Sequence, residues 1–418
     1  SLKDRASGSQ RISQTNAMKV PLLDVNAQNL PLEEELTATF TRVLHSGRFI
    51  MGPEVEELEQ EVAEFVGARH GIGVTSGTDA ILVALMALGI GPGDEVLCPT
   101  FTFFATAGCI ARTGATPVFV DACPVCFNID VEDAARKVTA RTKAIVPVHL
   151  FGQAAEMDEV MALAGEHDLR VIEDAAQAIG ARYRGRGCGS MGDFGTYSFF
   201  PSKNLGGFGD GGMVVCNDDA LAERTRMLRM HGSKPKYFHR EVGGNFRLDP
   251  LQAALLRVKL RYYDSYTRAR QENAAYYVEK LSVLEGVAPA SPEHCCCARA
   301  QEKALGETRV VLPVCYEHNQ HIWNQFTLRV RGKGRRDALR DHLMDRGIGC
   351  EIYYPLTMDQ QECFASLPES SRQGNEVAHY LAAEVLSIPV YPELTREMQD
   401  HVVAAVGEFL GADQTKEG

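Results

Sequence analysis

Leu169-Arg-Val-Ile-Glu-Asp174-Ala-Ala-Gln177-Ala178 is the stretch of this 418-residue sequence that decides its fold. The apolar residues before Glu173 are typical of a short buried strand, and the strand ends on the carboxylate of Asp174. In open α/β sheets, the groups that bind ligands lie at the carboxyl ends of the parallel strands. The stretch therefore predicts a parallel sheet with Asp174 at the edge of a binding site.

A second stretch, Gly195-Thr-Tyr-Ser198-Phe-Phe-Pro201-Ser-Lys203, reads as a short aromatic strand that breaks at the proline and places a lysine just past its end. A lysine in aromatic, partly dry surroundings loses its proton more easily and can form an imine with an aldehyde. A carboxylate opposite it can hold a ring nitrogen protonated, which makes a bound cofactor an electron sink. Asp174 and Lys203 together predict a pocket for pyridoxal 5′-phosphate (PLP). Lys203 is the expected catalytic lysine, and the alternative is that it is a solvated surface lysine. For Asp174 the alternative is an aspartate that only caps a turn.

Strand and helix patterns alternate from about residue 52 to residue 260. Buried strand patterns lie at 70–75, 94–98, 117–120, 143–148 and 170–172, with helical patterns at 54–65, 76–88 and 105–112. Such alternation predicts an α/β fold in which a mostly parallel sheet is sandwiched between helices.

The rest of the chain predicts a smaller α+β domain. A long amphipathic helical stretch covers 248–281, and strand patterns at 326–330 and 351–354 alternate with helices at 335–346 and 395–410. Residues 285–320 are the least patterned part of this region. We expect a tag or disordered leader (1–17), a large PLP-binding domain (18–260) and a small C-terminal domain (261–418).

Composition excludes several classes of protein. The formal net charge of −12 argues against general affinity for nucleic acid, which needs a basic face. No apolar run approaches the ~18 residues of a membrane span, and no secretory signal is visible, so the cytoplasm is expected. The 12 cysteines lack zinc-site or disulfide spacing, and both Cys123-Pro-Val-Cys126 and His294-Cys-Cys-Cys297 stand alone. We therefore expect free thiols and no metal.

Five motifs, in this order, resemble those of one enzyme family: Thr75-Ser-Gly-Thr-Asp-Ala80, Pro99-Thr-Phe-Thr-Phe-Phe-Ala-Thr106, Glu173-Asp-Ala-Ala-Gln177, Ser198-Phe-Phe-Pro-Ser-Lys203-Asn-Leu-Gly206 and Asn245-Phe-Arg247. They are similar to the motifs of the PLP-dependent sugar aminotransferases of the DegT/DnrJ/EryC1/StrS family. The similarity runs from about Met18 to the C-terminus. It implies fold type I, the fold of aspartate aminotransferase.

The resemblance assigns roles around the cofactor. Asp174 would pair with the ring nitrogen, Gln177 would donate to the 3-hydroxyl oxygen, and Phe103 would cover the ring, although core packing is an alternative for this phenylalanine. The phosphate needs backbone N–H groups at a helix N-terminus together with hydroxyls. The candidates for the phosphate site are Ser76, Gly77, Thr78 and Ser198. The alternative is a helix cap without a ligand.

The resemblance also implies a homodimer with shared active sites, in which the loop that carries Asn245 and Arg247 reaches the site of the neighbouring subunit. The basic residues between 229 and 240 could clamp a diphosphate, or could form an ordinary solvated loop. Arg247, Tyr353 and Tyr354 are the candidate substrate-binding residues. Histidine is frequent in the family where this chain has Tyr353.

The predicted reaction moves an amino group from glutamate to a nucleotide-linked keto-sugar. In the resemblance, Phe199-Phe-Pro-Ser-Lys203 followed by Gly209-Asp-Gly-Gly212 is the pattern of members that act on 3-keto sugars. A 4-keto sugar is the alternative substrate, and a PLP-binding regulatory protein without turnover is the alternative function. A nicotinamide oxidoreductase is the weakest reading, because no helix pattern follows the G-x-G-x-x-G match at 187–192.

Overall fold

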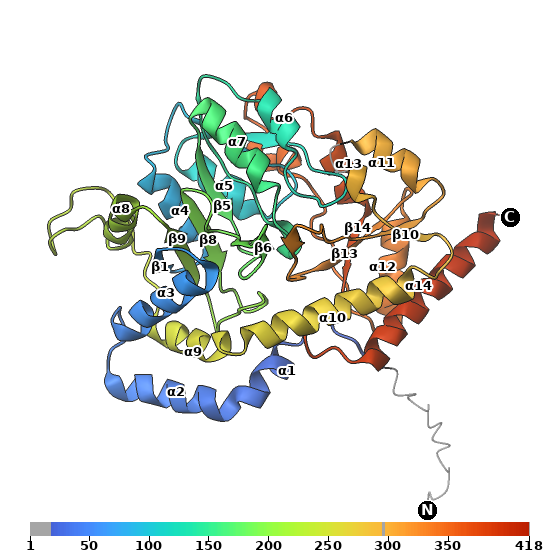
Figure 1. Ribbon diagram of the computed structural model, residues 1–418, viewed down its shortest axis with the longest axis horizontal. Helices are drawn as coiled ribbons and strands as arrows, with labels where there is room; N and C mark the ends of the chain where they lie inside the picture. Colours follow the sequence, from blue (N-terminus) through green and yellow to red (C-terminus); the bar gives the residue numbers. More distant parts are fainter. Residues whose placement is uncertain (1–17, 295–296, 418) are drawn as a thin grey trace, which may run out of the picture.

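The computed structural model describes residues 18–294 and 297–417, so the predicted leader at 1–17 and the cysteines Cys295 and Cys296 lie outside the described residues. A seven-stranded sheet forms the centre of the larger part (Figure 1). In spatial order its strands are β1 (His70–Val74), β9 (Gly212–Cys216), β8 (Phe194–Ser198), β5 (Arg170–Asp174), β4 (Thr142–Ile145), β2 (Glu95–Pro99) and β3 (Thr116–Val120).

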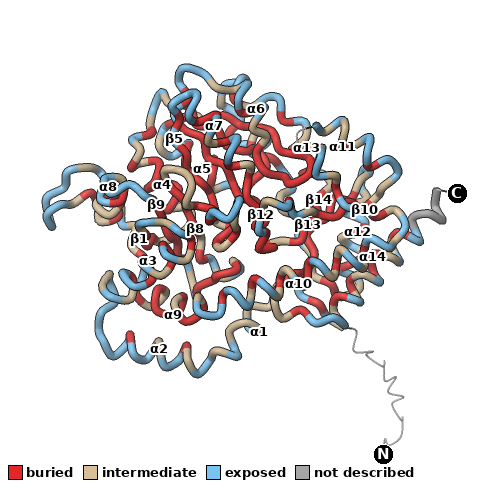
Figure 2. The backbone as a smooth tube through the Cα atoms, in the orientation of Figure 1, coloured by how far each residue is buried: buried red, intermediate tan, exposed pale blue. Residues whose placement is uncertain are grey.

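Every pairing in this sheet is parallel except the two that involve β9, which runs against β1 and β8. Side chains alternate between the faces of a strand, and so Val171 and Ile172 of β5 enter different hydrophobic clusters. Figure 2 shows the strands as the buried centre of the molecule. The predicted α/β sandwich with a mostly parallel sheet is confirmed.

Helices cover both faces. The first cluster receives residues from α3 (Pro53–Val66), α6 (Val131–Arg136), α7 (Met157–His167) and α9 (Pro250–Leu260). The second receives residues from α4 (Gly77–Ala87), α5 (Phe104–Arg112) and α8 (Asp219–Arg229). Outside these layers, α2 (Glu33–Ser46) packs on α9 after the short α1 (Val25–Asn29).

A four-stranded sheet in the order β10 (Val287–Pro289), β11 (Val310–Leu312), β13 (Phe326–Val330) and β14 (Val385–Ile388) forms the smaller part. Its helices are α10 (Tyr263–Leu281), α11 (Ala298–Leu305), α12 (Arg335–Asp345), α13 (Glu376–Glu384) and α14 (Arg396–Glu417). The α+β architecture is confirmed. The predicted boundary after residue 260 falls between α9 and α10 and stays a prediction.

The N-terminal end of the described chain packs against the smaller sheet. Val20 is fully buried in the same cluster as Phe326 and Leu328. Its N–H donates to the carbonyl of Gly347 at 2.9 Å, and its carbonyl accepts from Gly349 at 2.8 Å.

One local prediction was wrong. Residues 351–354 do not form a strand, since only Glu351 forms a bridge, with Ser387, before the chain turns so that Tyr354 packs against Phe101. Residues 285–320, the least patterned part of the sequence, supply the short strands β10 and β11 and the helix α11. The G-x-G-x-x-G match leads into β8, as expected for a stretch without a following helix.

Three short strands form a small sheet in the order β12 (Asn319–Gln320), β6 (Arg182–Tyr183) and β7 (Arg186–Gly187). Across the described residues, no helix is both long and apolar enough to cross a membrane.

Candidate active site

A cavity of about 470 Å³ lies where β1, β2, β5 and β8 end, on the side of their carboxyl termini. Residues 324–325 and 353–354 line it from the smaller part of the chain. Of the predicted residues, ten line the cavity: Ser76, Gly77, Thr78, Phe103, Asp174, Gln177, Ser198, Lys203, Tyr353 and Tyr354. Asn245 and Arg247 do not line it.

Lys203 follows the aromatic strand β8 in a tight turn, in which its N–H donates to the carbonyl of Phe200 at 2.8 Å. Pro201, which has no N–H to donate, lies in this turn, three residues after the end of β8. Loss of hydration lowers the pKa of the Lys203 amine to about 8, against the opposing attraction of Asp174. A lysine with this pKa has a substantial neutral fraction near neutral pH and is a competent nucleophile.

Asp174 is buried at the end of β5, and its carboxylate has two donors. Oγ1 of Thr106 donates to Oδ2 at 2.8 Å, and the N–H of Ala176 donates to Oδ1 at 3.2 Å. Burial raises the pKa of Asp174, while these hydrogen bonds and the nearby Lys203 and His149 act in the opposite direction. A partly desolvated carboxylate with few donors is a strong partner for a cationic ring nitrogen.

Gln177 is oriented by the backbone. Its Oε1 accepts from the N–H of Phe151 at 2.7 Å, and its Nε2 donates to the hydroxyl of Tyr354 at 3.0 Å. The amide therefore presents N–H groups, rather than its oxygen, toward the cavity. Burial raises the pKa of Tyr354, so its phenol stays protonated.

The N-terminus of α4 opens into the cavity. Oγ of Ser76 caps it by accepting from the N–H of Asp79 at 3.0 Å. A Cβ on Gly77 would lie 2.7 Å from Cβ of Ser198, so only glycine lets the end of β8 approach this helix end. Backbone N–H groups, the helix dipole and hydroxyls thus meet at one point, which is an arrangement that binds phosphate.

Phe103 precedes α5 and lines the cavity with a ring that is 56% exposed. The ring lies 6.1 Å from that of Tyr354, centroid to centroid. Most of its face is therefore free to stack on a ligand, which disfavours the alternative of a core phenylalanine.

Asn245 and Arg247 lie in the segment that follows a projecting basic loop beside α8 (Figure 1). The backbone of Asn245 pairs with Met230, and that of Arg247 with Val74. Asn245 is exposed and does not line the cavity of its own chain. Its assignment to a neighbouring subunit stays a prediction.

Sequence reasoning missed several residues that line or support the cavity. Asp210 belongs to the glycine-rich loop before β9, and it was quoted in a motif but given no role. Asn324 and Gln325 come from the smaller part of the chain, where no motif marks them. Thr106, which holds Asp174, ends the quoted motif at 99–106, and its place in the first turn of α5 was the available signal.

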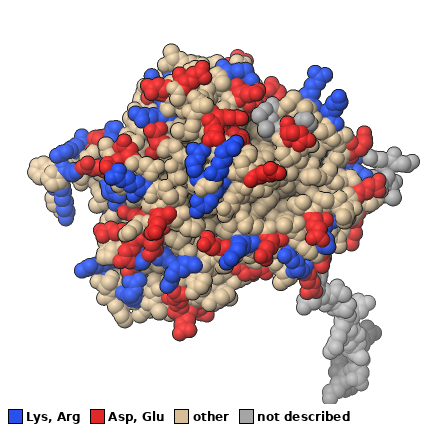
Figure 3. Space-filling model, viewed as in Figure 1, with Lys and Arg blue, Asp and Glu red and all other residues tan. Residues whose placement is uncertain are grey.

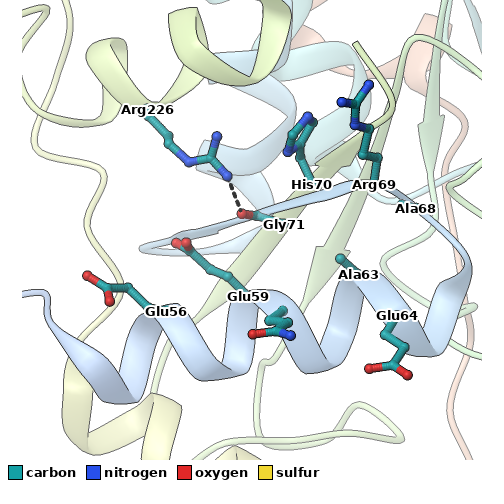
Figure 4. A pocket seen from close by; sticks show the side chains of 10 residues that line it. Glu56, Glu59, Ala63, Glu64, Ala68, Arg69, His70, Gly71 and Arg226 are labelled. Atoms are coloured by element: carbon teal, nitrogen blue, oxygen red, sulfur yellow. Dashed lines mark hydrogen bonds between the residues drawn. The ribbon is translucent and has the colours of Figure 1, made fainter. Parts of the chain in front are cut away.

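A second hollow, of about 430 Å³, lies between α3, the start of β1 and α8 (Figure 4). Two of its polar side chains already have partners: Arg226 donates to the carbonyl of Gly71 at 3.3 Å, and Nε2 of His70 lies 2.6 Å from Oδ1 of Asp219. It contains none of the predicted residues. The cavity at the strand ends is therefore the candidate active site.

The site combines a lysine of lowered pKa with a buried carboxylate, and it lies at the strand ends between an α/β part and an α+β part. This combination defines the class of aminotransferase-like enzymes. The chain belongs to the DegT/DnrJ/EryC1/StrS aminotransferase family, whose model matches residues 31–407. The predicted family and enzyme class are confirmed.

Individual relatives are similar over nearly their whole length. A pleiotropic regulatory protein of Geobacillus stearothermophilus is 47% identical over 94% of this chain and 99% of its own. The UDP-N-acetyl-3-dehydro-alpha-D-glucosamine 3-aminotransferase of Acidithiobacillus ferrooxidans is 42% identical over 95% of this chain and 99% of its own. The solved structure of S. venezuelae DesV in complex with a ketimine intermediate has a TM-score of 0.84 and 42% identity, and the match covers 94% of this chain and 98% of the DesV chain.

Proposed function

We propose that this protein is a PLP-dependent transaminase that moves an amino group from glutamate to the 3-keto group of a nucleotide-linked sugar. The observation that carries the proposal is the pairing of Lys203, with its pKa of about 8, and the buried Asp174 in one cavity. When bound there, PLP supplies an aldehyde and a ring that stores electrons while bonds to the substrate carbon change.

The residues present fit this cofactor. The N-terminus of α4, with Gly77 and the hydroxyls of Ser76, Thr78 and Ser198, would hold the phosphate. Asp174 would face the ring nitrogen, Gln177 the 3-hydroxyl oxygen, and Phe103 the ring. The close approach of Ser198 to Gly77, where a Cβ would lie 2.7 Å from Cβ of Ser198, is the specific sign of fit, because it brings the serine hydroxyl to the helix end that would bind an anion.

Lys203 has two tasks in this proposal. Its neutral amine would hold the cofactor, and the same amine would carry a proton to and from the substrate carbon. A pKa of about 8 lies close to neutral pH, so both proton states are populated, which is the condition for efficient general acid–base catalysis. Asp174 keeps the ring nitrogen protonated, and the rings of Phe103 and Tyr354 limit the access of water.

The charge of the cavity supports a shared site in a homodimer. Among the described residues that line it, Lys203 is the single cation, whereas Asp174 and Asp210 are acidic. The cofactor phosphate, a nucleotide diphosphate and glutamate are all anionic, so further cations are needed.

A second copy of the chain could supply these cations. The projecting loop carries basic residues (Figure 3) and exposes the rings of Tyr237 and Phe238 by 79% and 69%. We propose that this loop, with Asn245 and Arg247 behind it, reaches the cavity of the partner.

Two observations favour the 3-keto sugar. The chain has the motif Phe199-Phe-Pro-Ser-Lys203 followed by Gly209-Asp-Gly-Gly212, and the Acidithiobacillus relative is named for amination at position 3. The loop after Lys203 borders the cavity, so it affects how deeply a hexose enters. A shift of about one ring atom decides which ketone reaches the amine, since attack requires close, aligned approach.

A regulatory role without turnover is the second candidate, because the Geobacillus relative is named a pleiotropic regulatory protein. One experiment separates the candidates. Purified protein with PLP and ¹⁵N-labelled glutamate is offered the 3-keto and the 4-keto sugar on UDP and on dTDP, and label in the sugar is followed by mass spectrometry.

We expect multiple turnovers and the higher kcat/KM with a 3-keto sugar, and no label with the control variant Lys203→Ala. A preference for the 4-keto sugar would correct the position of amination. Bound PLP without labelled sugar from any of the four ketones would favour the regulatory role.

A further inference from the structure

The carboxylate of Asp174 depends on a hydroxyl from a neighbouring helix. Thr106 lies in the first turn of α5, and its Oγ1 is 2.8 Å from Oδ2 of Asp174. Thr106 is fully buried and Asp174 is 5% exposed, so water does not compete for this contact. Hydrogen bonds to charged groups are the stronger ones, and burial strengthens them further.

The direction of this hydrogen bond follows from the number of protons. An ionised carboxylate only accepts, and so the single hydroxyl proton of Thr106 points to Asp174. The hydroxyl of Thr102, which lines the cavity, lies 3.4 Å from that of Thr106 and is left to donate to it. Good O–H···O hydrogen bonds span about 2.5–3.0 Å, so this second contact is weak.

Other ionisable groups surround Asp174. Lys203 and His149 favour its charged form. The thiol of Cys109 and the phenol of Tyr354 also face it, and the negative charge of Asp174 contributes to raising the pKa of both. Of the groups that oppose the effect of burial on Asp174, Thr106 contributes most.

We propose that Thr106 is a positioning residue that keeps the shared proton on the ring nitrogen of the cofactor rather than on Asp174. This inference rests on the proposed function, in which Asp174 faces that nitrogen. A donor on the carboxylate lowers its affinity for a proton. Without the donor, the proton moves from the nitrogen to the carboxylate oxygen, and the ring loses its positive charge with no change in the total number of protons.

The test uses the holoenzyme reconstituted with PLP that carries ¹⁵N in the ring. Thr106→Val removes the hydroxyl and keeps the shape of the side chain, Thr106→Ser keeps the hydroxyl, and Thr102→Val removes only the weak contact. We expect the ¹⁵N chemical shift of a protonated ring in the wild type and in Thr106→Ser. In Thr106→Val we expect a large move toward the shift of an unprotonated ring, and in Thr102→Val a small one.

Activity gives a second readout. Loss of a hydrogen bond to a charged group should lower kcat of Thr106→Val about tenfold, with KM for the keto-sugar unchanged and activity restored in Thr106→Ser. If Thr106→Val fails to fold, Thr106→Ala provides the same loss of the donor. A folded variant without the hydroxyl and with the wild-type ¹⁵N shift would overturn the role of Thr106. A wild type that binds no PLP would instead overturn the proposed function itself.

Discussion

Replacing Gly77 with alanine would place a methyl carbon at the closest contact beside the cavity. A Cβ at this position lies 2.7 Å from Cβ of Ser198, whereas carbon atoms pack at about 3.5–4.0 Å. Ser198 ends β8, which is paired with β5 and β9, so the displacement of about 1 Å falls on the first turn of α4. Overpacking of this size costs about 1–3 kcal/mol.

The free energy of this overpacking should weaken cofactor binding rather than lower the stability of the fold. Alanine favours a helix over glycine by about 1 kcal/mol, which offsets part of the strain in the free protein. Cofactor binding needs the undisplaced helix end, so we expect PLP affinity to weaken about fivefold to 150-fold while Tm changes little.

The assay is a titration of the apo protein with PLP, followed by the absorbance of the bound cofactor, with thermal unfolding measured in parallel. Gly165→Ala is the matched control, because a Cβ on Gly165 in α7 meets no atom within 4 Å. Its affinity should equal that of the wild type. Wild-type affinity in Gly77→Ala would refute the assignment of this helix end to the cofactor phosphate.

Three further outcomes test the site. Borohydride treatment of the holoenzyme should fix the cofactor on Lys203 alone, as mapped by peptide mass spectrometry, and Lys203→Ala should bind PLP only non-covalently; an adduct on another lysine would contradict the assignment. Mixing inactive Lys203→Ala with inactive Asn245→Asp chains should restore some activity through one intact hybrid site, and no recovery despite proven subunit exchange would argue against shared sites. The rate at which the apo protein reacts with PLP should rise with pH and level off above about pH 8, since the amine is reactive when neutral and its pKa is lowered to about 8; a midpoint near the ordinary value of 10.5 would show that Lys203 is not desolvated.

The sequence was most informative where buried elements have a recognisable run of apolar residues. Six of the seven strands of the large sheet were predicted, because each is a short run of apolar or aromatic residues covered on both faces, whereas β9 (Gly212–Cys216) was not predicted. The helix of α4 could be located to its first residue, because Ser76 both precedes the apolar run and caps it.

Prediction failed where contacts between distant segments decide the conformation. Residues 351–354 have the β-branched and aromatic composition of a strand, yet Tyr354 packs on Phe101 and binds Gln177 instead. In β10 and β11 the strands are three residues each, too short for an alternating pattern to be recognised. Tertiary packing overrides such weak local preferences.

The candidate site likewise contains residues that the sequence predicted and residues that it did not. Lys203 and Asp174 follow strands directly, so their position at the sheet edge could be inferred from the chain alone. Thr106 and Asn324 support or line the cavity only because helices and domains bring them there. No motif marks Asn324, and the only local signal for Thr106 is its place in the first turn of a predicted helix.

The pairing of Val20 with Gly347 and Gly349 has a consequence for movement. The chain crosses from the smaller sheet to the larger one after Val20, through α1 to α2, and crosses back between α9 and α10. The smaller part is thus tethered by two separate stretches of backbone rather than by one. Two backbone crossings restrain the relative motion of the two parts more than a single linker would.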